Sequence, residues 1–139
     1  MTPMRNPGDY SLCDLAVSAA LTGVAQTPIQ NLEGMIAATI EAKLSYGSGG
    51  TSLKAYVQVT LDDGQTWIDV ASFAFTTASA IRIVNISGLT PKTTAVTPTD
   101  GSLADDTVVD GILGSAMRVK LTSVGTYINT ILSVKVSAR

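Results

Sequence analysis

Two pairs of adjacent aspartates, Asp62 with Asp63 and Asp105 with Asp106, are the residues whose type and spacing first suggest a chemical role. A glycosidase would place two carboxyl groups on opposite sides of a cleft. Neighbouring aspartates in loops that contain glycine are more typical of turns, because an Asp side chain accepts hydrogen bonds from nearby backbone amides. The two pairs therefore favour a structural role over catalysis.

The chain contains no histidine, which removes most of the usual catalytic and zinc-binding arrangements. Ser-His-Asp and Cys-His groupings cannot form, so a general base would have to be a carboxylate or a lysine. The common zinc spacings cannot be written either. An EF-hand spacing is absent, and only an irregular calcium site on the loop aspartates stays open: Asp62, Asp63, Asp105 or Asp106. We expect no enzyme and no cofactor.

Three further features each have a structural and a functional interpretation. The run Gly47-Ser48-Gly49-Gly50 has no following Lys-Ser or Lys-Thr, which favours a hairpin connection over a phosphate loop. Trp67, the only tryptophan, would suit sugar stacking if it were exposed. It opens a strand beside a turn, which favours packing over one end of the core with its indole N–H on a backbone carbonyl. Cys13 lies on the apolar side of its strand and is interpreted as a small buried hydrophobe.

Composition predicts a single domain built from strands. The 139 residues are 45% hydrophobic but only 5% aromatic, so the core must consist mainly of Ile, Val, Leu and Ala. The net charge is −2 and no basic block occurs, which argues against nucleic acid as a partner. The apolar segment 15–25 is short for a membrane span, and no secretory signal pattern precedes it. One cysteine excludes an intrachain disulfide and is compatible with assembly in a cytosol.

A β-hairpin is expected over residues 53–75, where apolar residues alternate before the turn Asp62-Asp63-Gly64-Gln65 and a return strand follows from Thr66. Residues 34–46 have the clearest strand pattern; a helical spacing of apolar residues is also present there, but polar residues at every second position favour a strand. Residues 12–21 are a candidate first strand or a short helix, and residues 22–34 are a connection with one short pairing. Further strands are expected at 79–87, 116–122 and 127–136.

These segments give about seven or eight strands at intervals of roughly ten residues, which is typical of an antiparallel β-sandwich or jelly roll. The predicted domain is residues 12–139. It is preceded by an extended arm, residues 1–11, and contains one long loop, residues 88–111, rich in Thr, Pro, Asp and Gly. Loops of this length inside compact domains are often functional.

The D-D-G-x-T-W turn with a Val-Ala return strand, the later run Ala116 to Thr122 and a final Ser-Val-rich strand together resemble a known pattern. It is that of the small jelly-roll capsid decoration, or cement, proteins of tailed bacteriophages, over roughly residues 12–138. The resemblance implies a structural virion protein, made in the host cytoplasm and bound to the exterior of the head. It also implies non-covalent contacts with the major capsid protein and with further copies of itself, in a dimer or trimer.

On this interpretation the arm and the long loop become ordered on a neighbouring protein. The residues expected to bind the partner lie in these two segments: Met1, Met4, Arg5, Tyr10, Leu89, Lys92, Val96 and Leu103. Two alternatives stay open. One is a neck or tail adaptor of the virion, and the other is a carbohydrate-binding β-sandwich that takes part in host adsorption through Trp67.

Overall fold

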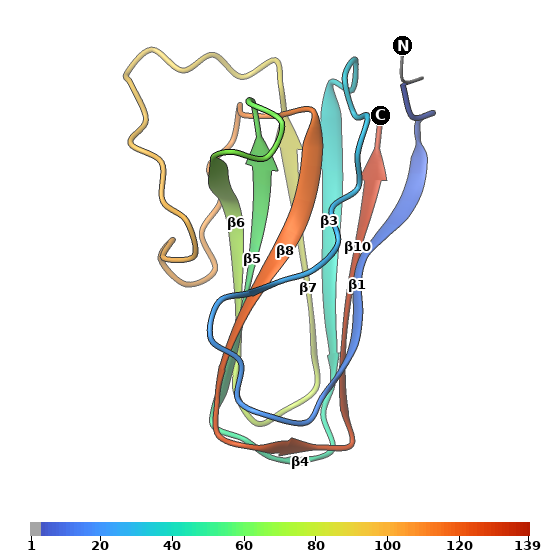
Figure 1. Ribbon diagram of the computed structural model, residues 1–139, viewed down its shortest axis with the longest axis vertical. Helices are drawn as coiled ribbons and strands as arrows, with labels where there is room; N and C mark the ends of the chain where they lie inside the picture. Colours follow the sequence, from blue (N-terminus) through green and yellow to red (C-terminus); the bar gives the residue numbers. More distant parts are fainter. Residues whose placement is uncertain (1–3) are drawn as a thin grey trace.

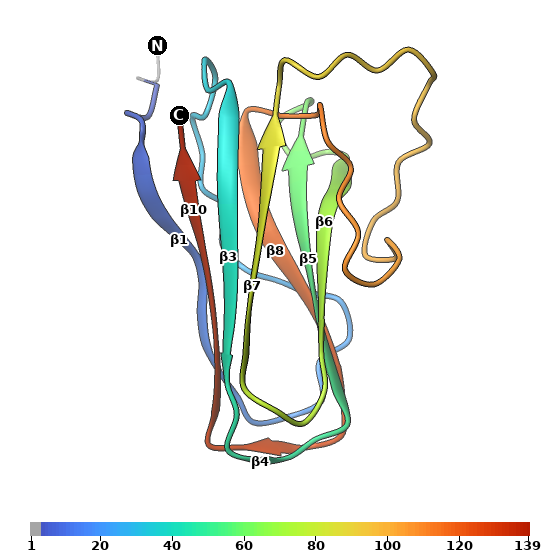
Figure 2. The same ribbon diagram turned by 180° about the vertical axis from the view of Figure 1, so that it is seen from behind.

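Residues 4–139, which the computed structural model describes, form ten β-strands with their connections and no helix. Met1, one of the expected partner-binding residues, lies outside this range. Figure 1 and Figure 2 show two sheets packed face to face. The first sheet contains, in spatial order, β1 (Gly8–Val17), β10 (Thr130–Ala138), β3 (Ala37–Ser45) and β7 (Ala80–Ser87). The second contains β2 (Val24–Ala25), β8 (Ala116–Val124), β5 (Ser52–Thr60) and β6 (Trp67–Phe75).

The order in which the strands pair is that of a jelly roll. Two short strands, β4 (Ser48–Gly49) and β9 (Tyr127–Ile128), pair only with each other across one end of the sandwich. Among the other eight, the first strand in the chain pairs with the last, β1 with β10, and the second with the seventh, β2 with β8. The third pairs with the sixth and the fourth with the fifth. Every pairing is antiparallel, so the predicted β-sandwich of jelly-roll type is confirmed.

Period-two alternation builds the core between the sheets. In β3 the buried positions alternate with exposed ones, which confirms the strand predicted at 34–46 and rules out its helical alternative. Burying one such aliphatic side chain contributes about 1.5–3 kcal/mol. The facing residues of β5 complete the layer. Aliphatic core residues of these two strands are Ala38, Ile40, Ala42, Leu44, Leu53, Ala55, Val57 and Val59.

The bounds predicted for the first strand are wrong at both ends. The strand begins at Gly8 and ends at Val17, because its ladder with β10 runs from Ala138 back to Thr130. A register shift between Ser11 and Cys13 puts two neighbouring side chains into the core, which breaks the alternation that the sequence suggested. Of the arm predicted over residues 1–11, only residues 4–7 precede the strand in the described part of the chain.

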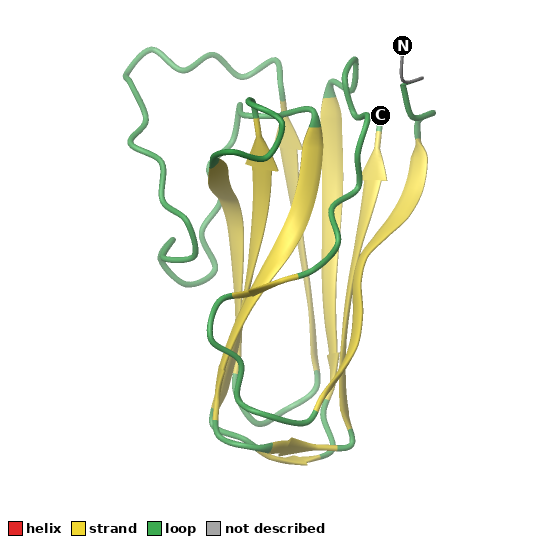
Figure 3. Ribbon diagram, in the orientation of Figure 1, coloured by secondary structure: helices red, strands yellow, loops and turns green. Residues whose placement is uncertain are grey.

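Irregular chain covers both edges of the second sheet. Beside β8, the backbone N–H of Gln26 donates to Val119 O at 2.8 Å, and Ile29 pairs with Met117. Beside β6, the N–H of Val109 donates to Val70 O at 2.8 Å. Covered edges cannot pair with further strands, so the second sheet ends within the domain. Figure 3 shows the long loop as the segment that stands farthest from the sandwich before it returns along β6.

Candidate functional site

The connection between β7 and β8 is the candidate site, because it holds the longest run of exposed residues in the described part of the chain. Residues 88–98 are all exposed, and they project from the upper end of the sandwich in Figure 1. Loops that carry function are commonly presented by a rigid scaffold in this way. Both ends of the projecting segment are fixed by aspartate side chains, Asp110 at its start and Asp69 at its end.

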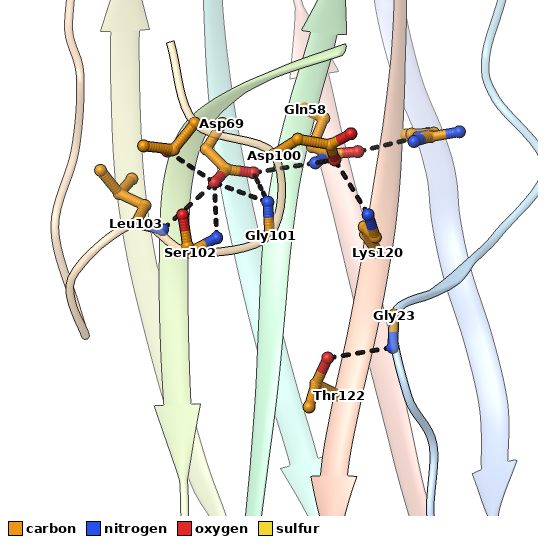
Figure 4. A network of polar contacts seen from close by, with 11 residues as sticks. Gly23, Gln58, Asp69, Asp100, Gly101, Ser102, Leu103, Lys120 and Thr122 are labelled. Atoms are coloured by element: carbon orange, nitrogen blue, oxygen red, sulfur yellow. Dashed lines mark hydrogen bonds and ion pairs between the residues drawn. The ribbon is translucent and has the colours of Figure 1, made fainter. Parts of the chain in front are cut away.

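Asp69, the third residue of β6, fixes the end of the segment. Its carboxylate is only 2% exposed and accepts hydrogen bonds from the N–H groups of Gly101, Ser102 and Leu103 at 2.8–3.1 Å. The hydroxyl of Thr99 donates to Oδ2 at 2.8 Å. Successive N–H groups aimed at one point form an anion-binding nest, which offsets the cost of burying a carboxylate. Figure 4 shows this nest, whose turn uses a left-handed Gly101 with φ of 85°.

Gln58, fully buried on the neighbouring strand β5, links this nest to the sheet. Its Nε2 donates to Asp69 Oδ1 at 2.9 Å and to Asp100 Oδ1 at 2.6 Å. Its Oε1 accepts a hydrogen bond from Arg118 Nε at 2.8 Å. The neutral amide thus lies between two carboxylates and one guanidinium with its side-chain oxygen and nitrogen both bonded. This accounts for a polar residue with no exposure in the centre of a strand.

Asp100 adds an ion pair to the same network. Its Oδ1 lies 3.0 Å from Lys120 Nζ, which reaches it from β8. Partial burial alone would raise the pKa of Asp100. The hydrogen bonds from Gln58 and Lys120, together with the charges of Lys120 and Arg118, outweigh that effect and hold the pKa below its usual value. The loop is therefore joined to β5, β6 and β8 through charged and polar side chains.

Asp110 fixes the start of the projecting segment. Its Oδ1 accepts the backbone N–H of Ser87 at 2.7 Å, and its Oδ2 accepts the hydroxyl of Thr90 at 2.9 Å. These two hydrogen bonds, the one from Ser87 foremost, lower the pKa of Asp110. Because Asp110 itself follows the segment in sequence, it closes the base of the loop on the end of β7.

Three of the four paired aspartates make hydrogen bonds or ion pairs within the domain. Asp105 Oδ1 lies 2.9 Å from Lys54 Nζ, and Asp106 Oδ2 lies 2.9 Å from Arg82 Nη1. Exposed pairs of this kind contribute little to stability, because solvent screens the two charges. Asp62 Oδ1 accepts the N–H of Thr66 at 2.8 Å and so closes the β5–β6 turn. Across residues 4–139, no cluster of three or more acidic or cysteine side chains has the placement of a metal site.

The expected partner-binding residues divide into exposed and internally bonded groups. Met4, Leu89, Lys92 and Val96 are exposed. Arg5 is held within the domain, since its guanidinium lies 4.9 Å from the centre of the Tyr10 ring and its Nε donates to Gln30 O at 3.0 Å. Tyr10 donates its hydroxyl to Asn6 O, and Leu103 is half-buried in the nest of Asp69. In Figure 1 the arm and the loop lie on opposite sides of one end of the sandwich. The structure therefore does not bring the expected partner-binding residues of the arm together with those of the loop.

The prediction that Trp67 packs in the core is wrong. Trp67 pairs with Thr60, which alternates with the core residue Val59, so the indole lies on the face of the sheet turned away from the core. The side chain is half-buried, and the guanidinium of Arg118 lies 4.2 Å from the ring centre. One face of the indole is therefore covered by a cation, which leaves little room for a stacked sugar. Cys13 is buried as predicted, and burial raises the pKa of its thiol to about 11.

Sequence reasoning missed Asp69, Gln58, Asp100 and Asp110, the residues that hold the loop. The available signal was a single acidic residue in the apolar run from Trp67 to Phe75 and a single amide between Val57 and Val59. Polar residues at such positions are buried only where hydrogen-bond partners meet them. Here the partners come from the loop, with Thr99 at a separation of 30 residues from Asp69 and Asp100 at a separation of 42 from Gln58.

In comparisons with known proteins, no family model, no curated protein and no solved structure matches this chain. Within the described range 4–139, the structure has no helix that is both long and apolar enough to cross a membrane. The fold and the site therefore define an all-β domain of jelly-roll type that presents one anchored loop.

Proposed function

We propose that the chain is a structural virion protein of a tailed bacteriophage, a capsid decoration protein that binds the outside of the head through residues 88–98. The observation that carries the proposal is the anchoring of this exposed segment at both of its ends by Asp110 and Asp69. A loop that served only to connect two strands would not need two sets of buried or charge-assisted hydrogen bonds.

The anchors favour binding because they order the loop before it meets a partner. Fixing a free backbone costs about 1–2 kcal/mol per residue, and a pre-ordered segment has already lost part of that freedom. The segment offers apolar side chains at Leu89, which is 75% exposed, and Val96, together with the cation of Lys92. A shallow protein surface with apolar and acidic groups would fit these side chains.

The partner in this proposal is the major capsid protein, and the effect is added stability of the shell through many non-covalent contacts. The jelly-roll architecture is compatible with such a role, since viral capsid domains use it, but it also serves lectins and enzymes. The argument therefore rests on the loop, and the fold supplies only the rigid frame.

Binding to preassembled heads tests the proposal. Recombinant protein is mixed with heads that lack it, and we expect it to sediment with them and to raise the temperature at which they release DNA or break. The double variant Leu89→Ser with Val96→Ser should bind at least tenfold more weakly, because each apolar side chain buried in a contact contributes about 1.5–3 kcal/mol.

Leu61→Ser is the matched control, because Leu61 is also exposed, at 67%, but lies in the β5–β6 turn. It should bind as the wild type does. Absence of binding to any virion component would overturn the proposal, and so would full binding by the double loop variant. Negative-stain images of labelled particles would place the protein on the head or, as the neck and tail alternative requires, at the tail.

A further inference from the structure

The outer edge of β7, from Ile81 to Asn85, is the one regular edge of the sandwich among the described residues whose backbone groups are free. The second sheet is covered along β8 and β6 by irregular chain. In the first sheet, β1 carries a register shift between Ser11 and Cys13, which makes an edge unsuitable for further pairing. In contrast, β7 keeps an unbroken register with β3 over its whole length, from Ala80 to Ser87. A long, regular edge of this kind is a site for strand addition.

Hydrogen bonds at the end of β7 show which of its backbone groups are free. The N–H of Gly88 donates toward β3, to Ile36 O at 2.7 Å, whereas the N–H of Ser87 points the other way, to Asp110. Alternate residues of a strand direct their backbone groups to the same side. The N–H and C=O groups of Ile81, Ile83 and Asn85 therefore point away from β3, and no hydrogen bond within residues 4–139 occupies them.

The side chains of the same three residues are exposed on the outer face. Ile81 is 58% exposed and Ile83 is 62% exposed, although both are isoleucines in the middle of a strand. Asn85 continues the row as an exposed polar residue. The edge thus combines unpaired backbone groups with apolar side chains that another strand would cover.

We propose that two copies of this chain associate through their β7 strands, antiparallel and related by a two-fold axis at Ile83. Residues that face each other in an antiparallel pair must point to the same side of the sheet, so the axis has to pass through a residue and not between two. Among such axes, one through Arg82 or Val84 would pass through a non-hydrogen-bonded pair and would pair only two of the three residues with free backbone groups with each other. An axis at Ile83 places Ile83 opposite its own copy and Ile81 opposite Asn85 of the other copy. All the free N–H and C=O groups of both strands are then paired, in six backbone hydrogen bonds.

The strand is complementary to itself in this register, which identifies a second copy as the occupant. Ile83 meets Ile83 on the outer face, and on the inner face Arg82 stands opposite Val84, so no like charges oppose each other directly. Each Arg82 is also neutralised by Asp106 of its own chain, at 2.9 Å. The four strands of each first sheet would then form one continuous sheet across the dimer. This inference does not depend on the proposed function.

Solution mass provides the first test. Light scattering after size exclusion, at concentrations from micromolar to millimolar, should show wild-type protein approaching twice the chain mass of 14.3 kDa. Ile83→Lys should restore the mass of a single chain, because it places two ammonium groups across the axis. Ile83→Pro should do the same by removing one free N–H, a change that edge strands tolerate because that N–H takes no part in the ladder.

Ile131→Lys is the matched control, since Ile131 is exposed on β10 in the same face of the sheet but away from its edge. It should dimerise as the wild type does. Thermal unfolding of each variant shows that the domain is intact. A wild-type protein that stays at single-chain mass throughout would overturn the proposal, as would dimers that survive both changes at Ile83.

Cysteine cross-linking tests the register itself. Ile83→Cys should give a disulfide-linked dimer under mild oxidation, because facing residues of a hydrogen-bonded pair have Cα atoms about 5.5 Å apart. Ile81→Cys should not, because its copy lies four residues along the partner strand, about 14 Å away. The native Cys13 is buried and does not compete. Cross-linking at position 81 and not at 83, or at neither position, would overturn the proposed axis.

Discussion

The backbone N–H of Gly101 lies within hydrogen-bonding distance of both carboxylate oxygens of Asp69, 2.9 Å from Oδ1 and 2.8 Å from Oδ2. One residue of β6 thereby fixes the returning end of a loop that left the sheet at β7. The contact makes the conformation of the loop depend on a buried charge in the strand beside it, which leads to measurable consequences.

Asp69→Asn should reduce the free energy of unfolding by about 2–4 kcal/mol, because the new amide keeps the shape but directs N–H groups at backbone donors. Urea denaturation measures the loss. We also expect cleavage by trypsin at Lys92 to accelerate, since the loop loses its anchor. Asp105→Asn, which removes only an exposed ion pair with Lys54, should leave the midpoint of urea denaturation nearly unchanged. Equal effects from the two variants would contradict the anchoring role of Asp69.

Gln58→Glu should destabilise the fold at neutral pH, because it places a third carboxylate between Asp69 and Asp100. Lowering the pH toward 5 should restore part of the loss as the new carboxyl group takes up a proton. Urea denaturation of the variant and the wild type at pH 7 and at pH 5 measures the loss of stability at neutral pH and its recovery in acid. A variant that is equally stable at both would show that the amide has no bridging role.

The stability that Asp100 and Asp110 contribute should be lost only in acid. The pKa values of Asp100 and Asp110 are lower in the folded chain than their ordinary value of 3.8, so the unfolded chain takes up protons first as the pH falls. Their stabilising contribution is complete above about pH 5 and is lost as the pH falls through the ordinary value and then through their folded-state pKa values. Denaturation curves should therefore coincide from pH 7 to about pH 5 and shift below pH 4. Asp110→Asn should show a smaller acid shift than the wild type.

Arg118→Ala should uncover the face of Trp67 over which the guanidinium lies at 4.2 Å. Because Trp67 is the only tryptophan, its emission should move to longer wavelength and become easier to quench with acrylamide. The loss of the cation–π contact should cost about 0.5–2 kcal/mol. Wild-type emission should not respond to added glycans, and a saturable response would support the carbohydrate-binding alternative instead.

Cys13 should resist thiol reagents in the folded protein. Its side chain is buried and its thiol pKa is raised to about 11 by desolvation and, to a smaller extent, by Asp14. Titration with a chromogenic disulfide at pH 8 should detect no fast-reacting thiol until guanidinium is added. A Leu61→Cys variant provides the positive control, since Leu61 is 67% exposed in the β5–β6 turn and takes no part in the proposed dimer.

The alternation of apolar and polar side chains predicted the strands, but it predicted neither the bounds of β1 nor the contacts that hold the long loop. Ile40, Ala42 and Leu44 alternate with charged residues, and that pattern alone identifies β3. The bounds of β1 depend on its partner β10, at the opposite end of the chain, and on a bulge that alternation does not reveal. Trp67 was misplaced because an aromatic residue gives no indication of which face of a sheet it occupies. Asp69 and Gln58 stand out as polar residues in apolar strands, but their roles could not be predicted, since the donors of Asp69 and the acceptor Asp100 of Gln58 lie in a loop whose path depends on the folded sheets.

The two anchors, Asp110 and Asp69, hold the ends of the loop without using the side chains in its middle. Thr90 and Thr99 are held by Asp110 and Asp69, while the residues between them are exposed and take no part in either set of hydrogen bonds. The intervening stretch, from Pro91 to Pro98, can therefore be exchanged for a foreign peptide whose ends meet the same two threonines. The domain thus has the construction of a peptide-display scaffold, in which the sequence presented can vary while the frame that presents it stays unchanged.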